Sequence, residues 1–210
     1  MEDQQLPPAP NRAQALVAKA GYTVYEAGRT LFDQPVLVYL PRKARRWPDY
    51  DIVDHVGRPL GAELKVGTPS PFEVTAPSRI VDSFGSPVLE IRPSRHLLRT
   101  EFAITGVATG SFVVKGLEGS RVSIEANRER FGMIRSSRLQ GLGVGEARVE
   151  DDAGNVVGRI RHLRTSRNPF RRQPAWVIGL DPMLRGPLRR LVVAAPSVLA
   201  AVRRVQEASA

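Results

Sequence analysis

The stretch Leu191–Val202 reads LVVAAPSVLAAV and holds twelve residues without a charge, in a chain otherwise rich in strand and turn patterns. Arginine pairs close it on both sides, Arg189 and Arg190 before it and Arg203 and Arg204 after it. At about 1.5 Å per residue a helix of this length covers about 18 Å, well short of the roughly 30 Å hydrocarbon core of a bilayer. A helix that is apolar on every face needs apolar surroundings. We therefore expect the chain's own β-sheet to surround it.

The residues before this stretch carry helix-start signals. Asp181 followed by Pro182 is typical of an N-cap and first helical position, and Gly186 followed by Pro187 allows a second start five residues later. Pro196 lies inside the apolar run, where it removes a backbone donor and crowds the preceding turn. We expect a kink or a break of the helix at this proline.

The middle of the chain repeats one pattern, in which two β-rich runs flank a short turn of Asp, Asn, Gly or other small residues. Such turn residues adopt backbone conformations that bulky residues resist, so each repeat predicts a β-hairpin. The repeats are Asp51–Leu64, Arg79–Ile91, Phe102–Val114, Val122–Ile134 and Ala147–Ile160.

Further strands are predicted on both sides of these hairpins. Tyr22–Tyr25 and Val36–Leu40 predict one more hairpin, and Ala175–Leu180 predicts a last strand. We expect a mainly β fold, a closed barrel of about twelve antiparallel strands around a buried C-terminal hydrophobic helix. Residues 1–20 are expected to form a flexible N-terminal tail with one or two helical turns at Ala13–Ala20, and residues 21–210 a single domain.

Three of these features together suggest a family. The successive D-x-x-G hairpins, the run IRPSRHLLRTEFAI (Ile91–Ile104) and the block WVIGLDPMLRGPLRRLVVAA (Trp176–Ala195) resemble the tubby C-terminal-like superfamily. Within it the chain is most similar to LURP-one-related and phospholipid-scramblase-like proteins, over roughly Tyr22–Val205. The resemblance implies a closed twelve-stranded barrel with the C-terminal helix through its middle. It also implies functions such as phosphoinositide binding, known for tubby-like members, and lipid scrambling, claimed for scramblases.

One property of scramblases does not transfer to this chain. Their calcium-binding segment lies just before the terminal helix, which corresponds to Ala175–Arg190, and Asp181 is the only acid there. Calcium takes six to eight oxygen ligands, commonly from several carboxylates. We therefore expect no calcium dependence. The chain also has no cysteine that could be palmitoylated.

Positive charge is concentrated near the C-terminus. The net charge is +10, of which residues 155–210 carry +9, with eleven arginines against two acids. A protein surface whose charges are nearly all positive usually binds phosphate groups of a membrane or a nucleic acid. Compositional bias is the alternative, because arginine outnumbers lysine 27 to 4, but this bias does not account for the scarcity of acids.

The densest basic segment is RIRHLRTSRNPFRR, at positions 159–172, which we expect to form a strand end and a loop. Guanidinium groups bind phosphate through two parallel hydrogen bonds, and a loop can direct several of them to one headgroup. A solvated loop without a ligand is the alternative. The candidate headgroup-binding residues are Arg159, Arg161, Arg164, Arg167, Arg171 and Arg172.

A second basic cluster surrounds a tryptophan between two prolines. Basic residues next to an indole suit a membrane interface, and they also suit single-stranded nucleic acid. An ordinary hairpin loop whose indole packs on the barrel wall is the interpretation that we favour. The cluster consists of Arg42, Lys43, Arg45, Arg46 and Trp47.

The sequence contains no pattern that favours an enzyme. His55, His96 and His162 lack metal-ligand spacing, and the GLGVG run at 141–145 is not followed by the Lys-Ser/Thr of a phosphate loop. Asp151 and Asp152 lie at a predicted turn, where aspartate commonly stabilises the backbone. We expect no catalytic residues, no metal and no cofactor.

The leading hypothesis is a non-enzymatic barrel that binds anionic membrane surfaces or phospholipid and phosphoinositide headgroups. A structural or protein-interaction barrel without a lipid ligand is the alternative, and nucleic-acid binding comes third. The N-terminal MEDQQLPPAPNR does not have the pattern of a signal peptide. We expect a cytoplasmic protein without transmembrane insertion, peripheral at the inner face of the membrane.

Overall fold

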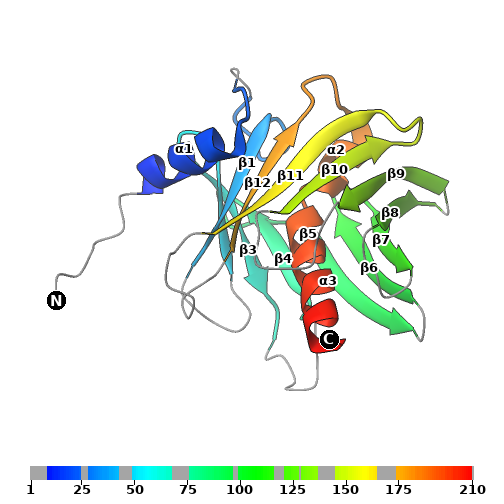
Figure 1. The fold of residues 1–210 in the computed structure, drawn as a ribbon. Coiled ribbons are helices and arrows are strands. Elements are labelled where there is room, and N and C mark those ends of the chain that lie inside the picture. Colours follow the sequence, from blue (N-terminus) through cyan, green and yellow to red (C-terminus); the bar gives the residue numbers. More distant parts are fainter. Residues whose placement is uncertain are drawn as a thin grey trace.

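The computed structural model describes residues 9–24, 28–42, 49–67, 76–96, 99–115, 121–127, 129–136, 145–164 and 174–209. In these residues twelve antiparallel strands form one closed barrel (Figure 1), in which each strand pairs with the next along the chain and β1 pairs with β12. The strands are β1 (Val36–Pro41), β2 (Tyr50–Val53), β3 (Pro59–Lys65), β4 (Ser78–Asp82), β5 (Pro87–His96), β6 (Arg99–Gly106), β7 (Gly110–Lys115), β8 (Arg121–Ala126), β9 (Glu129–Ser136), β10 (Gly145–Asp151), β11 (Val156–Arg164) and β12 (Pro174–Leu180). The helices are α1 (Ala9–Ala20), α2 (Gly186–Val192) and α3 (Ala195–Ser209). The predicted fold class is confirmed.

The five predicted hairpins are β2–β3, β4–β5, β6–β7, β8–β9 and β10–β11. In three of their turns an aspartate is followed three residues later by a glycine with φ between 85° and 89°. The aspartate Oδ1 accepts a hydrogen bond from the backbone N–H four residues on, at 2.7 to 2.9 Å. The pairs are Asp54 and Gly57, Asp82 and Gly85, and Asp151 and Gly154.

The apolar stretch Leu191–Val202 is buried throughout. It belongs to one core with inward-facing side chains from all twelve strands, among them Ile52, Ile104 and Ile160. The two C-terminal helices lie within the ring of strands, whereas α1 lies outside it (Figure 1). The two helices cannot cover their own apolar surface. Its burial inside the barrel removes this surface from water and thereby stabilises the fold.

The C-terminal segment forms two helices, because it is interrupted at Val193 and Ala194. Pro196 lies in the first turn of α3, where its missing N–H disrupts no helical hydrogen bond. The carbonyl of Val193 accepts a hydrogen bond from the buried hydroxyl of Tyr39 on β1. The helix break expected at Pro196 thus lies just before it, at Val193 and Ala194. The hydroxyl of Tyr39 supplies a hydrogen-bond donor to the Val193 carbonyl, which the break leaves between the two helices.

Two strand glycines make room for large side chains of α2. A Cβ at Gly110 would lie 2.9 Å from Leu191 Cδ1, and one at Gly132 would lie 3.3 Å from Leu188 Cδ1. The leucines of α2 therefore pack against strand positions that have no side chain.

The predicted helix start at Asp181 is wrong. Asp181 Oδ1 accepts the N–H of Met183 in a turn, and α2 begins only at Gly186, with Arg185 as an N-cap residue that makes no side-chain cap. The second predicted start, at Gly186 and Pro187, is correct. A turn forms first because β12 ends at Leu180 and the chain must reverse before it enters the core.

Two predictions for the N-terminal region need correction. Within residues 9–20 the expected flexible tail is helix α1, whose buried face (Ala13, Leu16, Val17, Ala20) packs on outward residues of β1, β11 and β12. Residues 22–24 form no strand, because β1 already pairs with β2 and β12 on its two edges. The ring of Tyr22 instead lies against Gly179 of β12.

The barrel has two different ends, which we define by their connections. The turn end holds the five hairpin turns and the chain between β12 and α2. The loop end holds the connections 42–49, 66–77, 97–98, 116–120, 137–144 and 165–173. Because α2 follows β12 at the turn end and α3 continues through the core, α3 runs toward the loop end. Arg203 of α3 contacts His162 of β11, and Arg203 and Arg204 lie near Tyr50, the first residue of β2.

A buried arginine closes the turn end. Arg189 of α2 donates hydrogen bonds to the carbonyl oxygens of Phe32, Gln34, Asp181 and Leu184. A buried cation is costly unless its donors are satisfied. These contacts anchor α2 to the two chain segments that cover the turn end.

Candidate functional site

Basic residues are unevenly divided between the two ends of the barrel. The six loop-end connections contain eight basic and three acidic residues, whereas the turn-end connections, 181–185 included, contain three of each. The two basic clusters predicted from the sequence reach the loop end through the connections 42–49 and 165–173, which adjoin the paired strands β1 and β12. These two connections are more than 100 residues apart in the chain and start from the same end of neighbouring strands.

The first predicted cluster is divided between the barrel wall and the loop end. Arg159 and Arg161 lie on the outer face of β11, where both face Glu146 of β10. Arg161 approaches Glu146 Oε2 to 2.6 Å, and Arg159 lies 4.0 Å from Oε1. Arg164 is the last residue of β11. Arg167, Arg171 and Arg172 lie outside the described residues.

The second predicted cluster has a fixed base. Arg42 Nε lies 2.7 Å from Asp51 Oδ1, and its backbone N–H donates to the carbonyl of Asp49. The guanidinium of Arg42 is thus engaged by a carboxylate of the same hairpin. The other members, Lys43, Arg45, Arg46 and Trp47, lie outside the described residues.

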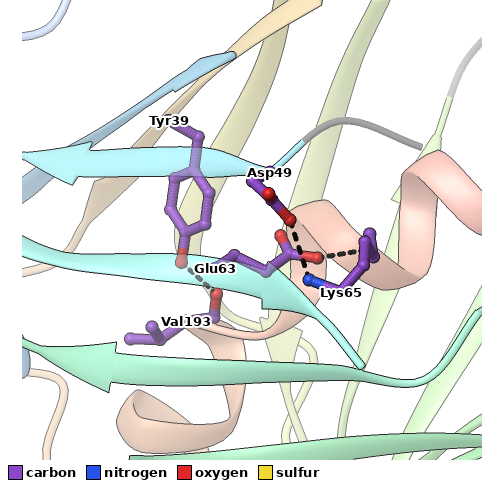
Figure 2. A network of polar contacts seen from close by, with 5 residues as sticks. All are labelled: Tyr39, Asp49, Glu63, Lys65 and Val193. Carbon is purple, nitrogen blue, oxygen red and sulfur yellow. Dashed lines mark hydrogen bonds and ion pairs between the residues drawn. The ribbon is translucent and has the colours of Figure 1, made fainter. Parts of the chain in front are cut away.

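Inside the barrel, near the loop end, a buried carboxylate pairs with a lysine (Figure 2). The side chain of Glu63 has no exposed surface and that of Lys65 is 13% exposed, and Lys65 Nζ contacts Glu63 Oε1. The backbone N–H of Lys65 donates to Asp49 Oδ1 at 2.8 Å. These contacts tie β3 to Asp49, the first described residue after the basic cluster.

Three buried polar atoms beside this pair have no hydrogen-bond partner among the described residues: Tyr50 Oη, Glu63 Oε2 and Trp176 Nε1. Burial raises the pKa of Tyr50, and the negative charge of Glu63 raises it further. The side chain of Trp176, Arg204 and Arg203 lower this pKa by smaller amounts. Burial and the charge of Glu63 also raise the pKa of Tyr39. Both phenols therefore stay neutral in the folded protein over the physiological range.

The end of α3 contacts this interior region. Arg203 Nη1 lies 2.9 Å from His162 Nε2, and the ring of His162 packs against Trp176 with centroids 4.7 Å apart. His162 thus lies between Arg203 of α3 and Trp176 of β12, and it links α3 to β11.

A row of four arginines crosses the outer wall, and sequence analysis did not predict it as a unit. Arg121 of β8 pairs in register with Arg135 of β9, Arg135 with Arg148 of β10, and Arg148 with Arg159 of β11. All four are exposed. Like charges directly opposite on neighbouring strands destabilise a sheet. We call these four residues the arginine row.

Only part of this charge is neutralised by neighbouring acids. Arg135 lies 2.8 Å from Glu150, and Arg159 shares Glu146 with Arg161. Arg121 and Arg148 form no ion pair within the described parts of the chain. The wall formed by β8–β11 therefore carries an uncompensated positive charge.

A pocket of about 300 Å³ opens beside the last member of the row. Its lining includes Arg159, Asp181 and Tyr22, whose hydroxyl is buried without a hydrogen-bond partner. Burial raises the pKa of Tyr22, against the positive charge of Arg161. The pocket combines one guanidinium with one carboxylate and does not by itself define a ligand.

Sequence reasoning identified Arg159 but not its three partners. Arg148 and Arg159 lie on opposite sides of the 152–155 turn and are paired across the β10–β11 hairpin. Predicting this pair from the sequence would have required the correct register of that hairpin. A register irregularity between Val149 and Glu150 shifts that register by one residue. The positions of Arg121 and Arg135 depend on a second hairpin and on the pairing of β9 with β10.

Two further searches cover only the part of the chain that the structure describes. No helix there is both long and apolar enough to cross a membrane. No group of three or more metal-ligating side chains is found in those residues.

Comparison with family models, curated proteins and solved structures finds no match for this chain. Its similarity to the tubby C-terminal-like superfamily thus stays a prediction.

Proposed function

We propose that this protein docks on anionic membrane surfaces through the loop end of its barrel. The segregation of charge between the two ends carries this proposal. The connections at the loop end hold five more basic than acidic residues, and those at the turn end are balanced. Anionic lipids attract basic segments with about 1 kcal/mol per lysine or arginine near the surface.

The interior contacts support a loop end that is rigid where it meets the strands. Arg42 is held by Asp51, and Lys65 by Glu63 and Asp49. Such contacts reduce the conformational entropy that a basic surface loses on binding. The tubby-like resemblance favours the same class of ligand, a phospholipid or phosphoinositide headgroup. A protein-interaction barrel without a lipid ligand is the competing function.

Vesicle flotation tests the proposal with two matched triple variants. Arg167→Gln/Arg171→Gln/Arg172→Gln removes three charges at the loop end, and Arg29→Gln/Arg58→Gln/Arg128→Gln removes three near the turn end. The parent and the turn-end variant should float with vesicles of phosphatidylcholine and phosphatidylserine. The loop-end variant should bind about 3 kcal/mol more weakly, roughly a hundredfold.

Equal flotation of the parent and the loop-end variant would show that these arginines form only a solvated surface. Equal loss in both variants would show that net charge matters and its location does not. Either result would overturn docking through the loop end. Failure of the parent to float would favour the protein-interaction barrel.

A further inference from the structure

The arginine row is a second basic feature, distinct from the loop-end connections. Each of its members lies on a strand and points outward, because its sequence neighbours Val122, Ile134, Ala147 and Ile160 belong to the core inside the barrel. The row crosses four adjacent strands of the twelve. It therefore follows the curvature of the wall over about a third of the ring.

The spacing of the row is set by the sheet. Neighbouring strands lie about 4.8 Å apart, so the row presents one guanidinium every few ångströms along a line. The register continues in the same direction, where Arg99 of β6 pairs with Lys115 of β7. A partner that neutralises such a line needs closely spaced negative charges along one chain.

We propose that the arginine row binds the backbone of single-stranded nucleic acid. A nucleic-acid strand carries one phosphate per 3.4 Å or so of its length, and guanidinium groups bind phosphate through paired hydrogen bonds. A flexible strand can follow a curved wall, whereas a flat bilayer touches such a wall over a narrower strip. This proposal goes beyond membrane docking and uses different residues.

Apolar side chains beside the row fit the same partner. Gly132 and Ile134 of β9 face the helices, and alternation along the strand places Phe131 and Met133 on the outer face with Arg135. Both are partly exposed. Nucleic-acid strands bind to surfaces that combine a basic track with aromatic side chains on which bases stack.

The lack of neutralisation within the protein points to an external anion. Arg148 has an arginine opposite it on both neighbouring strands, and no acid pairs with it among the described residues. An arrangement that repels itself in the free protein becomes favourable when phosphates lie between the guanidinium groups.

The test uses fluorescence anisotropy of a labelled 20-nucleotide oligo-dT, titrated with the full chain between 50 and 200 mM salt. The variant Arg121→Gln/Arg148→Gln removes the two members of the row that form no ion pair among the described residues. The control Arg79→Gln/Arg92→Gln removes two arginines of β4 and β5 on another part of the wall, where both face Glu90; Arg92 is exposed and Arg79 is half-buried. The change in net charge is the same in both.

The slope of log affinity against log salt should become shallower by about 1.4 for the row variant, because each phosphate contact contributes about 0.7. The control should keep the slope of the parent. The row variant should also melt at or above the temperature of the parent, because it loses like-charge repulsion.

Vesicle flotation of the same variants separates this proposal from membrane docking. A row variant that loses oligo-dT binding and still floats supports both proposals. Unchanged oligo-dT binding by the row variant, or no binding by the parent, overturns the nucleic-acid proposal and leaves membrane docking standing. Loss of flotation with oligo-dT binding retained also overturns it, because the row would then contact lipid.

Discussion

The two ends of the barrel use buried charge in opposite ways. At the turn end the guanidinium of Arg189 is satisfied by four backbone carbonyls, and the adjoining connections are neutral. Near the loop end Glu63 is paired through one oxygen only, two neighbouring polar atoms have no partner among the described residues, and the connections are basic. The comparison indicates that buried charge anchors the helices at the turn end and is less completely hydrogen-bonded near the loop end.

The largest expected effect tests the structural role of the turn end. Arg189→Met removes a guanidinium that bonds to four carbonyls. The carbonyls of Phe32 and Gln34 lose this donor, whereas those of Asp181 and Leu184 keep the N–H of Leu184 and the side chain of Arg185. We expect a loss of about 3 kcal/mol in the free energy of unfolding, measured by urea denaturation. Arg190→Met is the matched control, because Arg190 is exposed and bonds to the carbonyl of Val107, and it should cost less than about 1 kcal/mol.

Equal effects of the two substitutions would contradict the anchoring role of Arg189. A smaller loss of stability for Arg189→Met than for Arg190→Met would mean that Arg190, and not Arg189, anchors α2.

A smaller effect distinguishes two tyrosines that pack edge to face, with centroids 6.2 Å apart. Tyr39 donates to the carbonyl of Val193 at the helix break, whereas the hydroxyl of Tyr50, which lies near the indole of Trp176, makes no hydrogen bond of ordinary geometry among the described residues. Tyr39→Phe should therefore cost about 1 to 3 kcal/mol, because it leaves a buried carbonyl unpaired. Tyr50→Phe should change stability by less than about 0.5 kcal/mol, since it removes a buried hydroxyl that is not hydrogen-bonded.

Urea denaturation of both variants measures this difference directly. A costly Tyr50→Phe would mean that its hydroxyl is bonded in solution, and the contrast between the two ends would weaken.

The sequence predicted the architecture well, because the barrel is built from local signals. Three of the five hairpin turns have their own Asp and Gly, and the uncharged Leu191–Val202 run requires an apolar enclosure. The errors arose where tertiary contacts decide. The face of α1 is apolar only over Ala13–Ala20 and gains its partner from three strands that are distant in sequence. Tyr22–Tyr25 has strand-like residues, but no strand edge is left for it.

The candidate site was less predictable than the fold, for a similar reason. Contiguous clusters such as 42–47 and 159–172 are visible in the sequence. The connections 42–49 and 165–173 belong to one end because successive antiparallel strands are joined at alternate ends of the barrel. The arginine row is not contiguous, because its members lie 11 to 14 residues apart on four strands. Its alignment depends on two register irregularities, one in β8–β9 and one in β10–β11, which residue types alone do not specify.

The most direct test of the contrast between the two ends is a two-dimensional NMR titration of the labelled protein with phosphatidylserine-containing bicelles. The amides of Arg42, Asp49 and Lys65 report on the loop end, and those of Gly57 and Gly85 report on the turn end. Docking through the loop end predicts shifts or broadening of the first group, with the turn glycines unchanged. Equal or larger changes at the turn glycines would contradict the account.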